Sequence, residues 1–483
     1  MSLSPVHRCE TPGAYRRLAC VGVPLIVATL ALPSGACTTR CRGPGCEDDF
    51  ESMSVAGISG GALLEGESDI DDLTTLGEVV GLSSDGTGWS VAAAPGTSDL
   101  FVGKPEGQEV VRVSPASRGQ TDIGTEEAVF LLPEADFGAQ IALVSDGTDT
   151  GFDLWAASPS RDLDRGAIVR YPGAHEVVGL APAPVLLVRG DAQADRLGSH
   201  LFPCGDLTGD GRDDLVVSIP WWQPDPGLEV LGGASVPNLA GAVVVLTSEA
   251  FSEAVGERRA WELGPVYWGT AVGAGVGPGV ACRHDLDGDG LVDLAVGEPR
   301  VDEQAGAAHL ITQPLPDPGP LDLVAWRSIT SPEPAAWFGE ALTPLVWGDE
   351  TLLAIGAPGE AEGQGATYLF RPTDPEPLTP VGSYDSSRNT PDHVGRSLSA
   401  IDLDGDGNDE LFVGAPDYRE DNRTFGVGRL WVFRREEGLA PDLQDAVGIV
   451  TDTQPFRRIG RDLVFTDIDG DDLPDLWMPT QRP

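Results

Sequence analysis

The chain has 483 residues, of which 41% are hydrophobic and 22% are charged, and its formal net charge is −45 at pH 7. So large an excess of negative charge repels nucleic acid and anionic membrane surfaces, and we expect neither as a partner. The length could hold several domains, but the continuous repeats described below favour one large domain over residues 54–483.

Residues 1–36 have the pattern of an export signal. Three arginines precede an apolar run over residues 18–32, and this run is too short and too interrupted to span a membrane well. A Ser-Gly-Ala segment then precedes Cys37, as at the cleavage site of a bacterial lipoprotein. We therefore expect an exported protein of the bacterial cell envelope or cell surface, with lipid on Cys37, or else a secreted protein. A lipid anchor would be its one link to the membrane.

Residues 37–53 are rich in Gly, Asp and Glu, and we interpret them as a flexible tether. Five cysteines follow the signal segment. If the first of them carries lipid, four are left to pair, Cys41 with Cys46 in the tether and Cys204 with Cys282. The sequence leaves open whether the last two form a disulfide or remain buried free thiols, because it does not reveal the separation of their Cβ atoms.

A frame recurs seven times, about every 60 residues, and consists of an apolar residue followed by Gly and then an apolar run that ends in or near Pro. Its apolar-Gly pairs are Leu76-Gly77, Phe137-Gly138, Leu197-Gly198, Trp268-Gly269, Phe338-Gly339, Val394-Gly395 and Ile459-Gly460. Each period holds about four short strands and no convincing amphipathic helix. Four-stranded units repeated radially form a β-propeller. The predicted fold is therefore all-β, a seven-bladed β-propeller of four-stranded blades.

The last repeat has room for only two strands, whereas residues 54–58 and 62–64 supply strand material ahead of the first frame. We expect this N-terminal segment to complete the seventh blade, so that no long strand edge is left open. The alternative is an incomplete seventh blade.

Four of the frames contain an acidic phrase of nine residues with oxygen-bearing side chains at positions one, three, five and nine. Together with the backbone carbonyl of position seven, these oxygens would converge on one point, and hard oxygen ligands suit Ca²⁺. The predicted ligands, in the order of positions one, three, five, seven and nine, are Asp206, Thr208, Asp210, Arg212 and Asp214; Asp285, Asp287, Asp289, Leu291 and Asp293; Asp402, Asp404, Asp406, Asn408 and Glu410; and Asp467, Asp469, Asp471, Leu473 and Asp475.

These phrases are predicted to be strand-to-strand calcium loops, about four in all, and not EF-hands. An EF-hand has Glu at position twelve, where the second and third phrases have Val296 and Val413. The alternative is that they are ordinary turns, because Asp and Gly both favour turns. We expect the first and fourth sites to be the weaker ones, because Thr208 removes one charge and Asp472 replaces a Gly that suits a left-handed turn.

The combination of an apolar-Gly pair, an acidic loop and Gly-Ala-Pro, as written at 414–416 and 356–358, resembles the FG-GAP repeat of the integrin α-subunit propeller, here in a stand-alone bacterial form. The resemblance covers roughly residues 54–483. It implies a seven-bladed propeller with calcium loops on one face and ligand binding on the opposite face.

Five aromatic residues lie on loops that would form this opposite face, and they are candidates for ligand contact: Trp221, Trp222, Tyr267, Trp337 and Tyr418. Exposed aromatic rings suit a sugar or the side chains of a partner protein. The alternative is that they pack between blades. The expected function is a calcium-stabilised module for binding or adhesion at the cell surface, with a protein or a glycan as ligand.

Signals for catalysis are weak, and we predict no catalytic residue. The segment 57–61 matches G-x-S-x-G, but no strand-to-helix elbow surrounds it. Residues 189–191 spell Arg-Gly-Asp, which chance explains in a chain rich in Arg and Gly, and His200, His284 and His393 lack the spacing of a zinc helix. The rival functions are a carbohydrate-active or phospholipase-like propeller enzyme and a structural envelope protein.

Overall fold

The computed structural model describes residues 52–58, 66–69, 75–82, 90–94, 99–105, 107–113, 119–122, 128–132, 136–148, 151–223, 236–331, 333–375, 380, 382–385, 390–419, 426–435, 446–451, 458–461, 463–467 and 473–482. All of them belong to one compact unit, Glu47–Pro483. The predicted export signal, the lipidated Cys37, the tether and the pairing of Cys41 with Cys46 lie outside the described residues.

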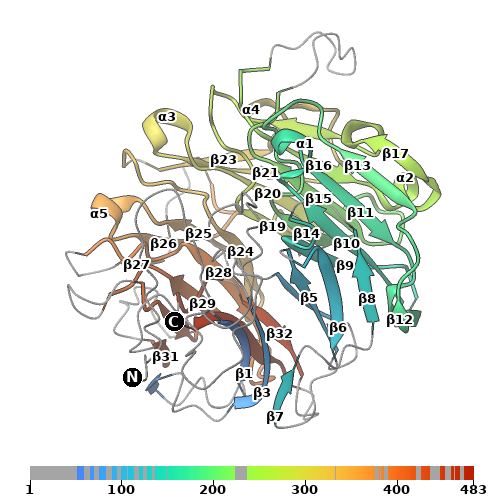
Figure 1. Cartoon of the computed structure of the whole chain (residues 1–483). Coiled ribbons are helices and arrows are strands. Elements are labelled where there is room, and N and C mark those ends of the chain that lie inside the picture. The colour runs from blue at the N-terminus through green and yellow to red at the C-terminus, as the bar shows by residue number, and fades with distance from the viewer. Residues whose placement is uncertain are drawn as a thin grey trace, which may run out of the picture. The chain divides into compact units, whose positions relative to one another are not determined.

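The described residues form an all-β protein, a β-propeller, and their strands group into seven sheets (Figure 1). We number the sheets in chain order. The first three contain, from the first strand to the fourth, β4 (Val91–Ala93), β5 (Leu100–Lys104), β6 (Glu109–Val113) and β8 (Ala128–Leu131); β9 (Gln140–Ser145), β10 (Phe152–Ser158), β11 (Ala167–Tyr171) and β13 (Leu186–Arg189); and β14 (Leu201–Gly205), β15 (Asp214–Ile219), β16 (Ala242–Leu246) and β18 (Val266–Trp268).

The remaining sheets repeat the same antiparallel order of four strands. They contain β19 (Val280–His284), β20 (Asp293–Glu298), β21 (Ala307–Ile311) and β23 (Arg327–Thr330); β24 (Leu342–Trp347), β25 (Glu350–Ala357), β26 (Ala366–Phe370) and β27 (Gly382–Asp385); β28 (Ser397–Ile401), β29 (Glu410–Ala415), β30 (Arg429–Phe433) and β31 (Gly448–Thr451); and β32 (Val464–Thr466), β33 (Asp475–Arg482), β1 (Ser52–Ile58) and β3 (Thr75–Leu82).

Sheet 7 joins the two ends of the described chain. Its strands β32 and β33 come from the C-terminal end, and β1 pairs antiparallel with β33 from Ser52 opposite Arg482 to Ile58 opposite Leu476. On its other side β1 pairs antiparallel with β3. The N-terminal strands thus occupy the third and fourth positions of a sheet that the C-terminal strands begin.

Five of the seven sheets carry a fifth strand, which four-stranded repeats did not predict. This strand pairs parallel with the fourth strand, and it comes from the connection between the third and fourth strands of the next sheet in the ring order. In these five sheets the outer edge is thereby covered by a strand from the neighbouring sheet, which removes an exposed edge. The fifth strands are β12 (Gly179–Leu180), β17 (Gly256–Arg259), β22 (Gly319–Pro320), β2 (Gly66–Asp69) and β7 (Gly119–Asp122).

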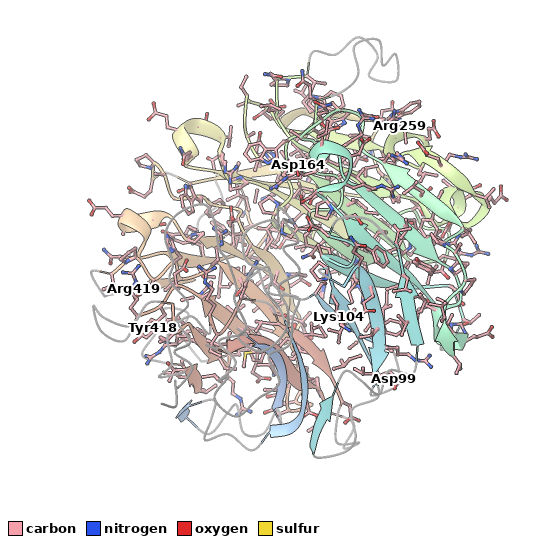
Figure 2. All side chains as sticks on the ribbon, in the orientation of Figure 1. Asp99, Lys104, Asp164, Arg259, Tyr418 and Arg419 are labelled. Carbon is pink, nitrogen blue, oxygen red and sulfur yellow. A yellow bond between two sulfur atoms is a disulfide. The ribbon has the colours of Figure 1, made fainter. Side chains whose placement is uncertain are left out.

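Helical segments are short and lie in the connections. The segments are α1 (Arg161–Asp164), α2 (Ser248–Glu253), α3 (Val301–Gln304), α4 (Leu321–Val324), α5 (Glu360–Gly363), η3 (Ala174–Glu176) and η5 (Ala260–Glu262). In α1, α3 and α5 the inner residues have positive φ, so these are left-handed turns that follow the second strand of sheets 2, 4 and 5. Asp164, which ends α1, is labelled in Figure 2.

Close contact between neighbouring sheets explains why the repeats contain two glycines. The glycine in the second strand of one sheet lies against the frame glycine of the next sheet. A Cβ atom on Gly297 would lie 1.9 Å from the carbonyl oxygen of Gly339, and one on Gly356 would lie 2.0 Å from that of Gly395. Only glycine permits this approach of two backbones. In sheets 2 and 3 the second-strand position is instead Ala157 and Ser218.

Two of the predicted frames are wrong. A frame glycine donates its N–H to the second strand of its own sheet, and in sheet 4 the donor is Gly277, which bonds to Gly297 O at 3.0 Å. The frame of this repeat is therefore 276–277, and Trp268 instead ends β18. Gly77 lies inside β3, where it pairs with Gly57, so Leu76-Gly77 does not begin the first repeat.

Candidate functional site

The acidic phrases connect the first and second strands of four sheets, as predicted for strand-to-strand loops. Residues 206–214 link β14 to β15, 285–293 link β19 to β20, and 402–410 link β28 to β29. Residues 467–475 link β32 to β33, and of these the structure describes only Asp467 and residues 473–475. The first three loops can therefore be compared bond by bond.

The carboxylate at position one organises each loop. In the second loop, Asp285 Oδ1 accepts the N–H of Gly288 at 2.6 Å, and Asp285 Oδ2 accepts the N–H of Gly290 at 2.7 Å. The first and third loops repeat both bonds, from Gly209 and Gly211 to Asp206 and from Gly405 and Gly407 to Asp402. The glycine at position six has a φ of +86° to +89° in all three loops, the left-handed region that disfavours other residues.

The carboxylate at position five stabilises the turn in the second half of each loop by a hydrogen bond. It accepts the N–H of position seven in each case, with Arg212, Leu291 and Asn408 donating to Asp210, Asp289 and Asp406 at 2.9, 2.8 and 2.8 Å. Three loops separated widely in the chain thus have one backbone conformation. Ordinary turns of differing sequence would not be expected to share it.

The carboxylate at position nine is buried beneath each loop. Asp214, Asp293 and Glu410 are 0%, 1% and 1% exposed, and each accepts the N–H of position two at 2.7 to 2.9 Å. Burial raises the pKa of each of these three carboxyl groups to about 6. The loss of water around these three carboxylates therefore outweighs the hydrogen bonds that they accept from the loop.

In two loops the carboxylates converge closely enough to share one cation. Oxygens of Asp285, Asp287 and Asp289 lie within 4.8 Å of one another, as do those of Asp402, Asp404 and Glu410. The Oδ1 atom of Asp293 also has no hydrogen-bond partner in the described part of the chain, although the side chain is buried. An oxygen-only donor set with an unpartnered buried oxygen fits a hard divalent cation such as Ca²⁺.

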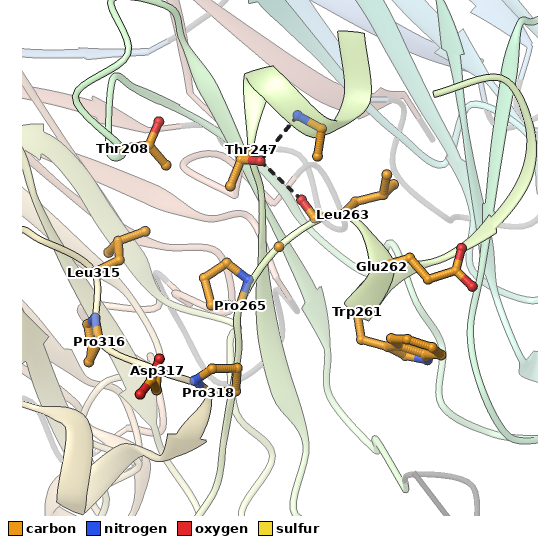
Figure 3. Close-up of a pocket in the computed structure, with 12 residues that line it drawn as sticks. Thr208, Thr247, Trp261, Glu262, Leu263, Pro265, Leu315, Pro316, Asp317 and Pro318 are labelled. Atoms are coloured by element: carbon orange, nitrogen blue, oxygen red, sulfur yellow. Dashed lines mark hydrogen bonds between the residues drawn. The ribbon is translucent and has the colours of Figure 1, made fainter. Parts of the chain in front are cut away.

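The first loop borders a pocket that the third-position residue helps to line. Thr208 stands in that loop where the second and third have Asp287 and Asp404, and it faces an open pocket of about 520 Å³ (Figure 3). The rest of the lining includes Trp261, Pro265 and Leu315, together with the acidic residues Glu262 and Asp317. Within the described residues, loop 206–214 forms no group of three convergent carboxylates.

The first two loops are tied to each other by a disulfide and by a side-chain contact that the sequence did not indicate. Cys204 and Cys282, just ahead of the two loops, form a disulfide, which resolves the alternatives left open above. The side-chain amide of Gln313 donates to Asp206 O at 2.9 Å and to Val292 O at 2.8 Å, and so bridges both loops. Gln313 is the second residue after β21. No motif or spacing in the sequence distinguishes it as a contact residue.

Three of the five predicted ligand-contacting aromatics are buried. Trp222, Tyr267 and Tyr418 (labelled in Figure 2) are 1%, 0% and 3% exposed, so the expectation that they form an exposed surface is wrong. The Trp222 indole N–H donates to Asp191 Oδ2 at 3.1 Å, and the Tyr267 hydroxyl donates to Pro316 O at 2.9 Å. These side chains have partners inside the fold and pack between sheets, the alternative stated from the sequence.

The other two aromatics are partly exposed. The Arg300 guanidinium lies 4.8 Å from the centre of a Trp221 ring, a cation–π contact. Trp337 is stacked on His393, with ring centres 5.9 Å apart and planes 10° apart. Trp221 follows the second strand of sheet 3, and Trp337 lies between the fourth strand of sheet 4 and the first strand of sheet 5. Both connections are at the end of the sheets opposite the acidic loops, because antiparallel strands place alternate connections at opposite ends.

The remaining sequence motifs belong to the fold. Gly57 and Ile58 of the G-x-S-x-G match lie in β1, which is paired on both sides and is not a strand-to-helix elbow. Asp191 of the Arg-Gly-Asp segment is 7% exposed and accepts the Trp222 N–H, so it is not presented to a partner. His200 Nδ1 lies 3.3 Å from Ser218 Oγ, and burial lowers the pKa of His200 to about 4.

Comparisons with known proteins agree with the repeat analysis. An FG-GAP repeat family model matches residues 394–433, which contain the third acidic loop. Integrin alpha-X of Mus musculus is 33% identical over 197 residues, which cover 38% of this chain and 16% of that protein. Phosphatidylinositol-glycan-specific phospholipase D of Rattus norvegicus is 38% identical over 88 residues, which cover 17% of this chain and 10% of that protein. These matches confirm the resemblance, and they span less than a fifth of the length of either relative.

A solved structure of the Dos1 propeller aligns with a TM-score of 0.41 at 10% identity, over 81% of this chain and 76% of that one.

In the part of the chain that the structure describes, no helix is both long and apolar enough to cross a membrane.

Proposed function

Because the chain is an FG-GAP repeat protein similar to integrin α-subunits, we propose that it is a calcium-stabilised, seven-bladed β-propeller that binds a protein partner outside the cell. The calcium sites are the four acidic loops, and the partner binds at the opposite face. Support for seven blades comes from the seven sheets within the described residues and from the pairing of β1 with β33, which lets the two ends of the chain complete one blade. Export is supported by the pattern of residues 1–36.

The observation that carries the calcium assignment is the common bonding pattern of the three fully described loops. In each, backbone N–H groups hold the carboxylates of positions one, five and nine in place. When Ca²⁺ is bound, it supplies positive charge to carboxylates that otherwise repel one another. In the second loop Asp285, Asp287, Asp289 and Asp293 would hold the ion.

The proposed partner face carries an aromatic and charged row across three consecutive sheets. Trp337 stacks on His393, His393 Nδ1 lies 3.0 Å from Asp417 Oδ2, and Arg458 Nη2 lies 3.9 Å from Asp417 Oδ1. The side chains of His393, Asp417 and Arg458 are 25% to 48% exposed. Tryptophan and arginine side chains that are at least partly exposed, as here, are the residue types that dominate protein interfaces. Their presence supports a protein ligand over a sugar.

A binding screen against an array of extracellular proteins tests this proposal. We expect calcium-dependent capture of at least one protein, and Trp337→Ala should weaken that binding about 30-fold, as loss of an interface hot spot does. Trp326→Ala is the matched control, because Trp326 is 41% exposed but lies ahead of β23, at the acidic-loop end of its sheet. Equal binding by the Trp337 variant and the unaltered protein would contradict the assignment of this face.

A further inference from the structure

The third acidic loop is paired with a cationic side chain that comes from outside the loop. Arg434, the residue after β30, donates from Nε to Glu410 Oε1 at 3.2 Å, and its Nη2 bonds to Asp404 Oδ2. Asp404 and Glu410 are two of the three carboxylates that converge in this loop, together with Asp402. The guanidinium therefore binds two of the carboxylates that a divalent cation would use.

In the other two fully described loops, the buried carboxylate at position nine has no arginine partner among the described residues. In the first loop the position-nine carboxylate receives a neutral donor, because the Ser248 N–H donates to Asp214 Oδ1 at 2.7 Å. The Ser248 hydroxyl also donates to Asp210 Oδ2 at 2.6 Å. In the second loop the corresponding Asp293 Oδ1 has no partner in the described part of the chain. Among these three loops, an arginine thus pairs with ligand carboxylates in the third.

The third loop is also held from outside by the neighbouring sheet. Asp409 Oδ2 accepts the N–H of Val346 at 2.6 Å, and the Trp347 indole N–H donates to Asp409 O at 2.8 Å. Asn408 Oδ1 accepts the N–H of Gly348 at 2.8 Å. These bonds to the end of β24 and to the β24–β25 connection fix the loop without using the carboxylates that would hold the ion.

We propose that Arg434 is a built-in counter-ion of the third loop, which keeps that loop folded at low calcium and competes with calcium for Asp404 and Glu410. This inference rests on the proposed function, since it assumes that the loops bind calcium. The Arg434 side chain is 37% exposed and Asp404 is 30% exposed, so the guanidinium can leave toward water when the ion enters. The third loop then binds calcium more weakly than its full set of carboxylates would predict, and the second loop depends on the ion most.

Isothermal titration of the whole chain with CaCl₂ tests the inference when the unaltered protein is compared with Arg434→Gln. The variant keeps a long polar side chain but loses the charge. We expect one site to bind calcium about tenfold to hundredfold more tightly in the variant, because the ion no longer displaces a charge-assisted hydrogen bond. Thermal melting gives a second readout: the variant should melt lower than the unaltered protein in EDTA and recover at saturating calcium.

Arg371→Gln is the matched control, since Arg371 follows the third strand of sheet 5 just as Arg434 follows that of sheet 6. Arg371 pairs with Glu350 at 2.9 Å, in a sheet without an acidic phrase, so its loss should leave calcium affinity unchanged. If the unaltered protein binds calcium and Arg434→Gln binds it with the same affinities, the inference is overturned and the proposed function stands. If neither protein binds calcium, both are overturned.

Discussion

Removal of calcium with EDTA is expected to lower the free energy of unfolding by about 1.6–5.6 kcal/mol. Extracellular calcium modules have dissociation constants of about 10⁻⁴ to 10⁻³ M, and at about 1 mM Ca²⁺ each site contributes about 0.4–1.4 kcal/mol by mass action. Four such sites supply the total, which is a large share of the ~5–15 kcal/mol that stabilises a typical domain. The physical cause is the repulsion among converged carboxylates once the ion is gone. Urea unfolding with and without chelator measures the loss.

The control is EDTA that has been saturated with calcium before it is added, which should leave the unfolding curve unchanged. Asp289→Ala should reproduce part of the loss in calcium buffer, because one site is removed and the others remain. Identical curves in EDTA and in calcium would contradict the prediction and favour the reading of the phrases as turns.

Trp222→Ala is expected to destabilise the protein by about 3–5 kcal/mol, as truncation of a buried tryptophan does. Trp222 is 1% exposed, its ring lies 6.1 Å from that of Trp268, and its indole N–H satisfies the buried carboxylate of Asp191. The substitution therefore leaves a cavity and removes one hydrogen bond from the Asp191 carboxylate. The midpoint of urea unfolding and its slope give the change in free energy.

Trp221→Ala is the matched control for Trp222→Ala, because the adjacent indole is partly exposed beneath Arg300. Its loss should cost about 0.5–1 kcal/mol, the range of a surface cation–π contact. If the two variants lose the same stability, Trp222 is not the core residue that the structure shows.

The acidic loops could be predicted from the sequence because their information is local. Carboxylates at alternate positions and a glycine at position six act within nine residues, so the turn, the strand on each side and the glycine with positive φ all follow from spacing. The frames could be predicted less securely, because an apolar-Gly pair is too short to identify one position in the repeat. An apolar-Gly pair occurs both at 268–269 and at 276–277, and only the bond from Gly277 to Gly297 O distinguishes them.

Features that depend on neighbouring sheets could not be predicted. The burial of Trp222, Tyr267 and Tyr418 is set by side chains from other strands. The pairing of Arg434 with the third loop forms within sheet 6, but between residues 24 positions apart, and no spacing pattern marks it. The fifth strand of a sheet, such as β12, comes from the next repeat in the chain and pairs over only two residues. Periodicity within one repeat carries no signal for such an exchange.

Equilibrium dialysis of the whole chain against about 1 mM Ca²⁺, followed by elemental analysis of the protein and of the dialysate, tests the central claim most directly. The account predicts about four calcium ions bound per chain in excess of the dialysate, and fewer when Asp289 is replaced by Ala. A chain that retains no calcium above the dialysate, while still folded, would contradict it.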